Sequence, residues 1–120
     1  MMARDRIINR RQNDELRMHL LGGGTLVSQA IVAFNLPKLC RLLEQLAKYE
    51  GFCATTDPSG EHAFGVFEFE GTKIVFKIES DILSSQLVSS GGTLMPTERI
   101  LTIMLAEEYF AVAANLHDRR

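Results

Sequence analysis

Residues 63–79 constrain the fold more than any other part of the sequence, because apolar and polar residues alternate on both sides of Glu70-Gly71. Alternation with a period of two is typical of β-strands, and a short pair ending in glycine suits the turn of a β-hairpin. With the turn placed there, Phe69 lies opposite Thr72 and one register serves both faces. The side chains that this register gathers on the expected core face are Ala63, Gly65, Phe67, Phe69, Thr72, Ile74, Phe76 and Ile78.

The opposite face of the predicted hairpin carries one pair of opposite charges, Glu68 across from Lys73. It also carries Phe64, Val66 and Val75, which is more apolar surface than a fully solvated face needs. We therefore expect another element of the chain, or a binding partner, to cover this face.

Two segments before the hairpin have the pattern of helices. In residues 36–50 leucines recur at three- and four-residue spacing, Asn35 can cap the first turn, and Pro37 is tolerated there. In residues 5–20 the apolar positions are sparse at first. We expect a helix there too, with its first turns loosely packed.

The run Gly22-Gly23-Gly24 follows the first of these helices. A phosphate-binding loop would follow a strand, open a helix and carry a Lys-Ser/Thr pair, and this run does none of these. We interpret it as a helix stop and a flexible turn. The β-like residues 25–32 after it predict a strand.

Residues 97–112 predict a third helix, because Thr97 can cap it and apolar residues surround more than half of its circumference. Residues 80–95 before it form a serine- and glycine-rich loop, and a loop of this length is typically either mobile or a binding element. Residues 113–120 are expected to be a frayed tail.

Together these patterns predict one α+β domain over residues 1–120, large enough to bury a single core. An antiparallel sheet is expected around the central hairpin, with strands at 63–69 and 72–79. About three helices are expected to pack mainly on one face of that sheet.

The segment just before the hairpin, residues 57–62, has two interpretations. As a structural turn it offers an aspartate that accepts backbone bonds, a proline at the second position and a glycine at the end. The second interpretation is a metal-assisted or acid/base site formed by Asp57, Glu61, His62 and Glu79. Glu79 is included because it lies opposite His62 in the predicted register. We favour the turn, because this spacing does not make the groups converge, and we expect no metal or cofactor.

Five arginines near the N-terminus raise the question of nucleic-acid binding, and they are Arg4, Arg6, Arg10, Arg11 and Arg17. Acidic residues interrupt them and no aromatic residue lies among them. A nucleic-acid footprint favours an unbroken basic face with aromatic readers. A solvated amphipathic helix explains the arginines equally well.

The composition, with 46% hydrophobic and 23% charged residues, is that of a globular protein. No apolar run approaches the roughly 18 residues of a membrane span. The charged N-terminus lacks the apolar middle of a signal peptide. We therefore expect a cytoplasmic protein without a membrane partner, in which Cys40 and Cys53 are reduced.

The segments TDPSGEHAFG and TERILTIMLAEEY resemble a small bacterial family known only as a domain of unknown function, common in alphaproteobacteria and often carried on mobile elements. Its turn typically reads Asn-Asp-Pro-x-Gly-Glu-His-Asp-Phe-Gly, and the second segment is expected to be a helix. This chain departs from the pattern at Thr56, Ala63, Phe76 and Glu79. The resemblance covers about residues 22–109 and implies an α+β domain, but no known activity.

The leading interpretation of function is a small non-catalytic module that binds a protein partner, with a homodimer also possible. No nucleophile, base and orienting group can be assembled from the sequence. The expected contact surface combines the second hairpin face with the loop after it: Phe64, Val66, Val75, Leu83 and Leu87. The alternatives are a metal-assisted or acid/base enzyme centred on residues 57–62, and a nucleic-acid accessory protein that uses the N-terminal arginines.

Overall fold

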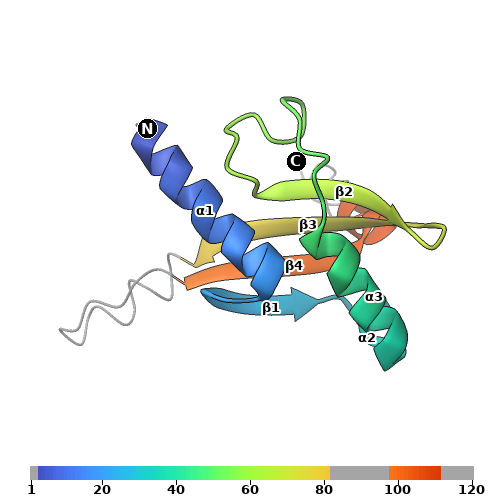
Figure 1. The fold of residues 1–120 in the computed structure, drawn as a ribbon. Coiled ribbons are helices and arrows are strands. Elements are labelled where there is room, and N and C mark those ends of the chain that lie inside the picture. Colours follow the sequence, from blue (N-terminus) through green and yellow to red (C-terminus); the bar gives the residue numbers. More distant parts are fainter. Residues whose placement is uncertain (1–2, 82–97, 112–120) are drawn as a thin grey trace, which may run out of the picture.

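The computed structural model describes residues 3–81 and 98–111 (Figure 1). The elements follow in the order α1 (Ala3–His19), β1 (Gly23–Val27), α2 (Gln29–Val32), α3 (Leu36–Ala47), β2 (Phe64–Phe69), β3 (Thr72–Asp81) and β4 (Glu98–Leu105). Residues 106–111, called the C-terminal helical segment below, continue directly from β4 as a helix.

The four strands form one sheet in the order β1-β4-β3-β2. β2 pairs antiparallel with β3 and β3 pairs antiparallel with β4, whereas β1 pairs parallel with β4. The predicted α+β class is confirmed, and the sheet is antiparallel except at its β1–β4 pair.

The central hairpin has the predicted register, with Phe69 opposite Thr72. Both turn residues have left-handed backbone angles, with φ of 49° at Glu70 and 83° at Gly71. Such a turn has the same twist as the strands on either side, which keeps the pairing in register.

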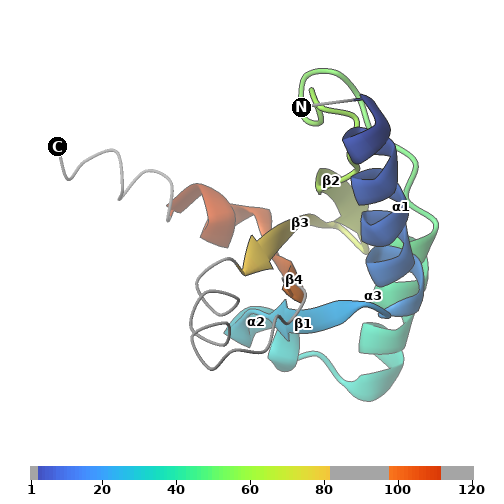
Figure 2. The same ribbon diagram turned by 90° about the vertical axis from the view of Figure 1, so that its left-hand side faces the viewer.

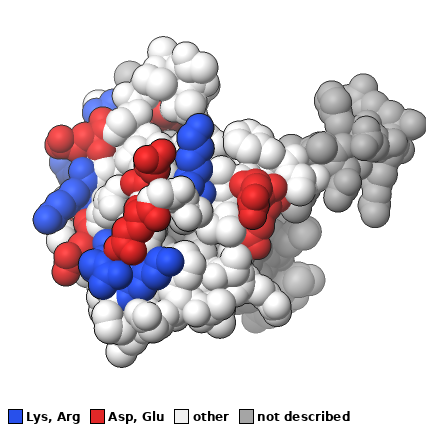
Figure 3. Space-filling model, turned by 90° about the vertical axis from the view of Figure 1, so that its right-hand side faces the viewer, with Lys and Arg blue, Asp and Glu red and all other residues white. Residues whose placement is uncertain are grey.

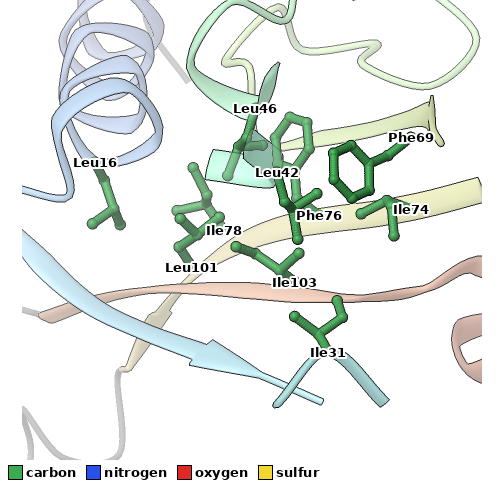
Figure 4. Packing of buried hydrophobic residues seen from close by; sticks show 10 residues of the cluster. All are labelled: Leu16, Ile31, Leu42, Leu46, Phe69, Ile74, Phe76, Ile78, Leu101 and Ile103. Atoms are coloured by element: carbon green, nitrogen blue, oxygen red, sulfur yellow. The ribbon is translucent and has the colours of Figure 1, made fainter. Parts of the chain in front are cut away.

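One face of the sheet, called the front face, is covered by α1 and α3 (Figure 2). Side chains from β2, β3 and β4 meet side chains from the helices there to form the core (Figure 4). The core residues are Leu16, Ile31, Leu42, Leu46, Phe69, Ile74, Phe76, Ile78, Leu101 and Ile103. Of the three predicted helices, the two at residues 5–20 and 36–50 pack on this one face, as predicted.

The start of α3 is as predicted. The side chain of Asn35 accepts a hydrogen bond from the backbone N–H of Lys38 at 2.9 Å, and Pro37 occupies the first turn. The helix ends at Ala47, earlier than the predicted end at residue 50.

The helix predicted at residues 97–112 is wrong over most of its length, because Glu98–Leu105 is β4 and the helix begins only at Ala106. β4 carries apolar side chains on both faces, because Leu101 and Ile103 on the front face are buried and Ile100 and Met104 on the other face are partly buried. A strand that is covered on both faces shows a continuous apolar run without a period of two, and such a run is easily taken for a helix.

The strand predicted at residues 25–32 is displaced and shortened. β1 spans Gly23–Val27, and α2 begins directly after Ser28. The glycine run is more than a flexible turn. Gly22 has a left-handed φ of 89°, but a Cβ on Gly23 would collide with the carbonyl oxygen of Arg99, so glycine there lets β1 approach β4 closely.

The other face of the sheet is called the back face. Its apolar members, found from the strand register, are Leu26, Phe64, Val66, Val75, Ile100 and Met104. Among the described elements, the C-terminal helical segment lies on this side of the sheet (Figure 2), where the ring of Tyr109 is 5.5 Å from that of Phe64.

Candidate functional site

The turn before β2 is organised by Asp57, whose side chain is buried. Its two carboxylate oxygens accept hydrogen bonds from the backbone N–H of His62 at 3.2 and 3.1 Å. The backbone N–H of Asp57 donates to the carbonyl oxygen of Cys53 at 2.7 Å, and the N–H of Gly60 donates to the carbonyl of Asp57 at 3.0 Å. These bonds fix the left-handed conformation of His62, where φ is 60°.

The imidazole of His62 points to α1. Its Nδ1 lies 2.8 Å from Oδ1 of Asp14, and the same oxygen accepts a bond from the buried guanidinium of Arg17 at 2.7 Å. The ring of Phe52 stacks on the imidazole at 3.9 Å, and the Arg17 guanidinium lies 5.2 Å from the centre of the Phe52 ring. The Asp14 carboxylate is thus shared between the His62 imidazole and the Arg17 guanidinium, and both of these groups pack on the Phe52 ring.

Glu61 and its neighbour Gly60 also bind α1. The Glu61 carboxylate accepts a bond from the Asn9 amide at 3.0 Å, and its backbone carbonyl accepts one from the Asn13 amide at 2.9 Å. The backbone carbonyl of Gly60 accepts a bond from Nε of Arg10 at 2.8 Å. The turn therefore acts as a cradle for one side of α1.

Arg99 at the start of β4 completes this cradle. Its guanidinium donates to the side-chain oxygens of Asn13 at 2.8 Å and Asn9 at 2.9 Å, and also to that of Gln12. Burial lowers the pKa of Arg99, while the nearby Glu61 carboxylate opposes that shift. Sequence reasoning missed Asn9, Asn13 and Arg99, although the four-residue spacing of the two asparagines on one helix face is a signal for a shared partner.

The candidate chemical groups of the turn do not converge. The carboxylate of Asp57 faces the His62 backbone, the imidazole faces Asp14, and the carboxylate of Glu61 faces Asn9. Glu79, expected opposite His62, instead pairs with Lys77 at 3.0 Å. Within residues 3–81 and 98–111, no group of three or more His, Cys, Asp or Glu side chains is placed to hold a metal ion.

The predicted contact surface is only partly accessible. Val75 is completely buried, whereas Phe64 and Val66 are half-buried. Leu83 and Leu87 lie outside the described residues.

The N-terminal arginines are in different environments. Arg17 is buried, Arg10 is bonded to the turn, and Arg6 and Arg11 are exposed on α1. The side chain of Arg4 lies outside the described part of the chain. In the view of Figure 3, basic and acidic side chains are intermixed and form no field of one sign.

Both cysteines are free and exposed. The Thr56 hydroxyl, 3.4 Å from the Cys53 sulfur, lowers the pKa of that thiol, and backbone hydrogen bonds from Thr56 and Thr55 add to the effect. Cys53 belongs to the same turn as Asp57, so its reactivity depends on the turn staying folded.

Among the helices that the structure describes, none has the length and apolar character needed to cross a membrane. No curated protein and no solved structure matches the chain. One family does match, over residues 27–108, and that range includes the turn, the hairpin and β4 but leaves out α1. The chain belongs to this family, which is described as Protein of unknown function (DUF3768).

Proposed function

We propose that this protein is a non-catalytic module of the bacterial cytoplasm that binds another protein through the back face of its sheet. The main support is that one sheet carries apolar side chains on both faces. The front face is covered by helices, whereas the only described element over the back face is the C-terminal helical segment.

The accessible part of the back face has the chemistry of a protein contact. Leu26 on β1 is 59% exposed and Phe110 on the C-terminal helical segment is 57% exposed, with half-buried Phe64 and Val66 on the same side. Exposed apolar side chains that share one face favour a protein interface. We infer a partner that presents an apolar surface without a strong charge of one sign.

The contacts of the turn support the non-catalytic part of this proposal. Asp57, Glu61 and His62 bind the backbone and α1, so their chemistry is used in holding the fold together. Arg17 is also used inside the fold, because its side chain is buried against Phe52. This burial favours a protein partner over a nucleic acid.

Site-specific photo-crosslinking in host cells tests the proposal. A benzophenone amino acid at Val66 or Phe110 is expected to capture one defined partner, because Val66 lies on the back face and Phe110 is exposed on the C-terminal helical segment beside it. Ile7, which is 58% exposed on α1, is the matched control and is expected to capture nothing in common with them. Identical products from all three positions, or none from the back face, would reject the back face as the contact surface.

A further inference from the structure

β1 forms one edge of the sheet, with β4 on its inner side (Figure 1). The backbone N–H of Ser28 donates to the carbonyl oxygen of Ile103 at 3.0 Å. In a parallel ladder the residues that bond one neighbouring strand alternate, so Leu26 also directs its backbone groups to β4. The residues of β1 whose backbone groups point away from β4 are therefore Gly23, Thr25 and Val27.

Among the described residues, this outer edge has no charged side chain, proline or covering strand. Natural edge strands are protected by charged side chains, prolines or covering segments. From Leu20 to Leu36 the sequence has no charged residue and no proline. Within the described residues no strand pairs with the outer edge of β1. Large apolar side chains that are exposed in this stretch are Leu20, Leu21, Leu26, Val32 and Leu36.

We propose that β1 pairs antiparallel with β1 of a second copy of the chain, about a two-fold axis at Thr25. Thr25 then faces its own copy, Gly24 faces Leu26, and Gly23 faces Val27. Each large side chain meets a glycine, which leaves room for it over the opposite backbone. The strand is thus complementary to itself, as an interface with two-fold symmetry requires.

The backbone directions agree with this pairing. Gly23, Thr25 and Val27 point outward, and the two-fold arrangement places each of them opposite another outward residue. Such pairs exchange both of their N–H···O bonds in an antiparallel ladder. The dimer therefore gives hydrogen-bond partners to the outward N–H and C=O groups of β1 in both copies, and it joins the two sheets into one.

A strand of five residues buries little area by itself, so the dimer needs further apolar contact. We assign this contact to the exposed Leu21, Val32 and Leu36, which flank β1 in the same uncharged stretch of the sequence. The absence of charge also means that no like charges meet across the axis. This edge contact shares Leu26 with the back-face surface but leaves Phe64, Val66 and Phe110 unused, so crosslinking at Val66 and Phe110 tests the back-face partner separately from the dimer.

A charge exchange at the axis tests the proposal with the full chain. Sedimentation equilibrium of the wild type is expected to give twice the 13.4 kDa mass of one chain. Because Thr25 faces itself, Thr25→Lys or Thr25→Glu alone places like charges together, and each is expected to weaken the dimer about fivefold. An equimolar mixture of the two variants pairs opposite charges and is expected to recover the wild-type affinity.

Two further variants separate pairing from folding. Thr25→Ser keeps the backbone and the neutral character, so its dimer affinity is expected to match the wild type. Thr25→Pro removes an outward N–H and leaves the β4 ladder intact, so the dimer is expected to weaken tenfold or more while the thermal midpoint of the dilute protein stays the same. A monomeric wild type, or a dimer that Lys, Glu and Pro at residue 25 leave unchanged, overturns the proposal.

Discussion

The two edge strands of the sheet treat their outer backbone groups differently. On β2, the outward carbonyl of Glu68 accepts a bond from the Gln45 amide of α3 at 2.6 Å. On β1, the described residues offer no such bond to the outer groups of Thr25.

Charge follows the same division. The β2 edge ends at Glu70, which pairs with Arg41 of α3 at 2.7 Å, and Glu68 faces Lys73 on its back side. The β1 edge lies in an uncharged stretch. The difference agrees with the proposed pairing of β1, because an edge that pairs with a second copy needs no separate protection.

Gly65 in β2 and Gly24 in β1 give the largest expected contrast. A Cβ on Gly65 would lie 2.5 Å from the Phe76 ring and 2.7 Å from the Tyr49 ring, whereas one on Gly24 would meet only the Ile100 side chain at 3.5 Å. Because packed rings yield little, Gly65→Ala is expected to lower the free energy of unfolding by about 3 kcal/mol. Gly24→Ala, the matched control, is expected to stay within about 0.5 kcal/mol of the wild type. Urea unfolding measures both, and equal losses would contradict the contrast.

Gln45→Met is expected to have an intermediate effect. It removes the amide that bonds the outward Glu68 carbonyl and keeps the length of the side chain, so a loss of about 1 kcal/mol in the free energy of unfolding is expected. It also opens the β2 edge. Size-exclusion chromatography should then reveal association that Thr25→Pro does not suppress, and a variant as stable and as dispersed as the wild type would show that this edge needs no protection.

The smallest expected effect is a pH dependence at the end of β2. The Arg41 guanidinium, through its hydrogen bond, holds the pKa of Glu70 below its ordinary value. The stabilisation is therefore present above the ordinary glutamate pKa and is lost as the pH falls through the lowered folded-state pKa. The wild type should exceed Arg41→Met in urea midpoint at neutral pH and lose that small advantage in acid. A difference in urea midpoint that does not change with pH would show that Arg41 stabilises the protein through packing and not through its ion pair with Glu70.

The hairpin could be predicted to the residue because its two faces differ in polarity, so only one register between Phe64 and Lys77 satisfies both. β4 could not, because most of its residues on both faces of the sheet are apolar and at least partly buried, which removes the alternation from Ile100 to Leu105. The burial of β4 on both faces also explains why the sequence predicts a helix from residue 97, although the helix begins only at Ala106.

The α1 cradle shows a different limit of sequence reasoning. The structural role of Asp57 follows from local turn chemistry and was predicted. The partners of Glu61 and His62, which are Asn9 and Asp14, lie far away along the chain. The spacing of Asn9 and Asn13 marks one face of α1 but does not identify its partner, so only the folded chain brings these residues together.

The parallel pairing of β1 with β4 determines the order in which the strands of the sheet can pair during synthesis. During synthesis β1 emerges from the ribosome early, whereas Arg99, which pairs with Gly23, is added late. The hairpin, whose contacts are local, can form in between, and closing the long separation to β1 is a slow step by comparison. An uncharged strand thus lacks its neighbour for most of translation, and we expect the nascent chain to be most prone to association with other chains during this interval.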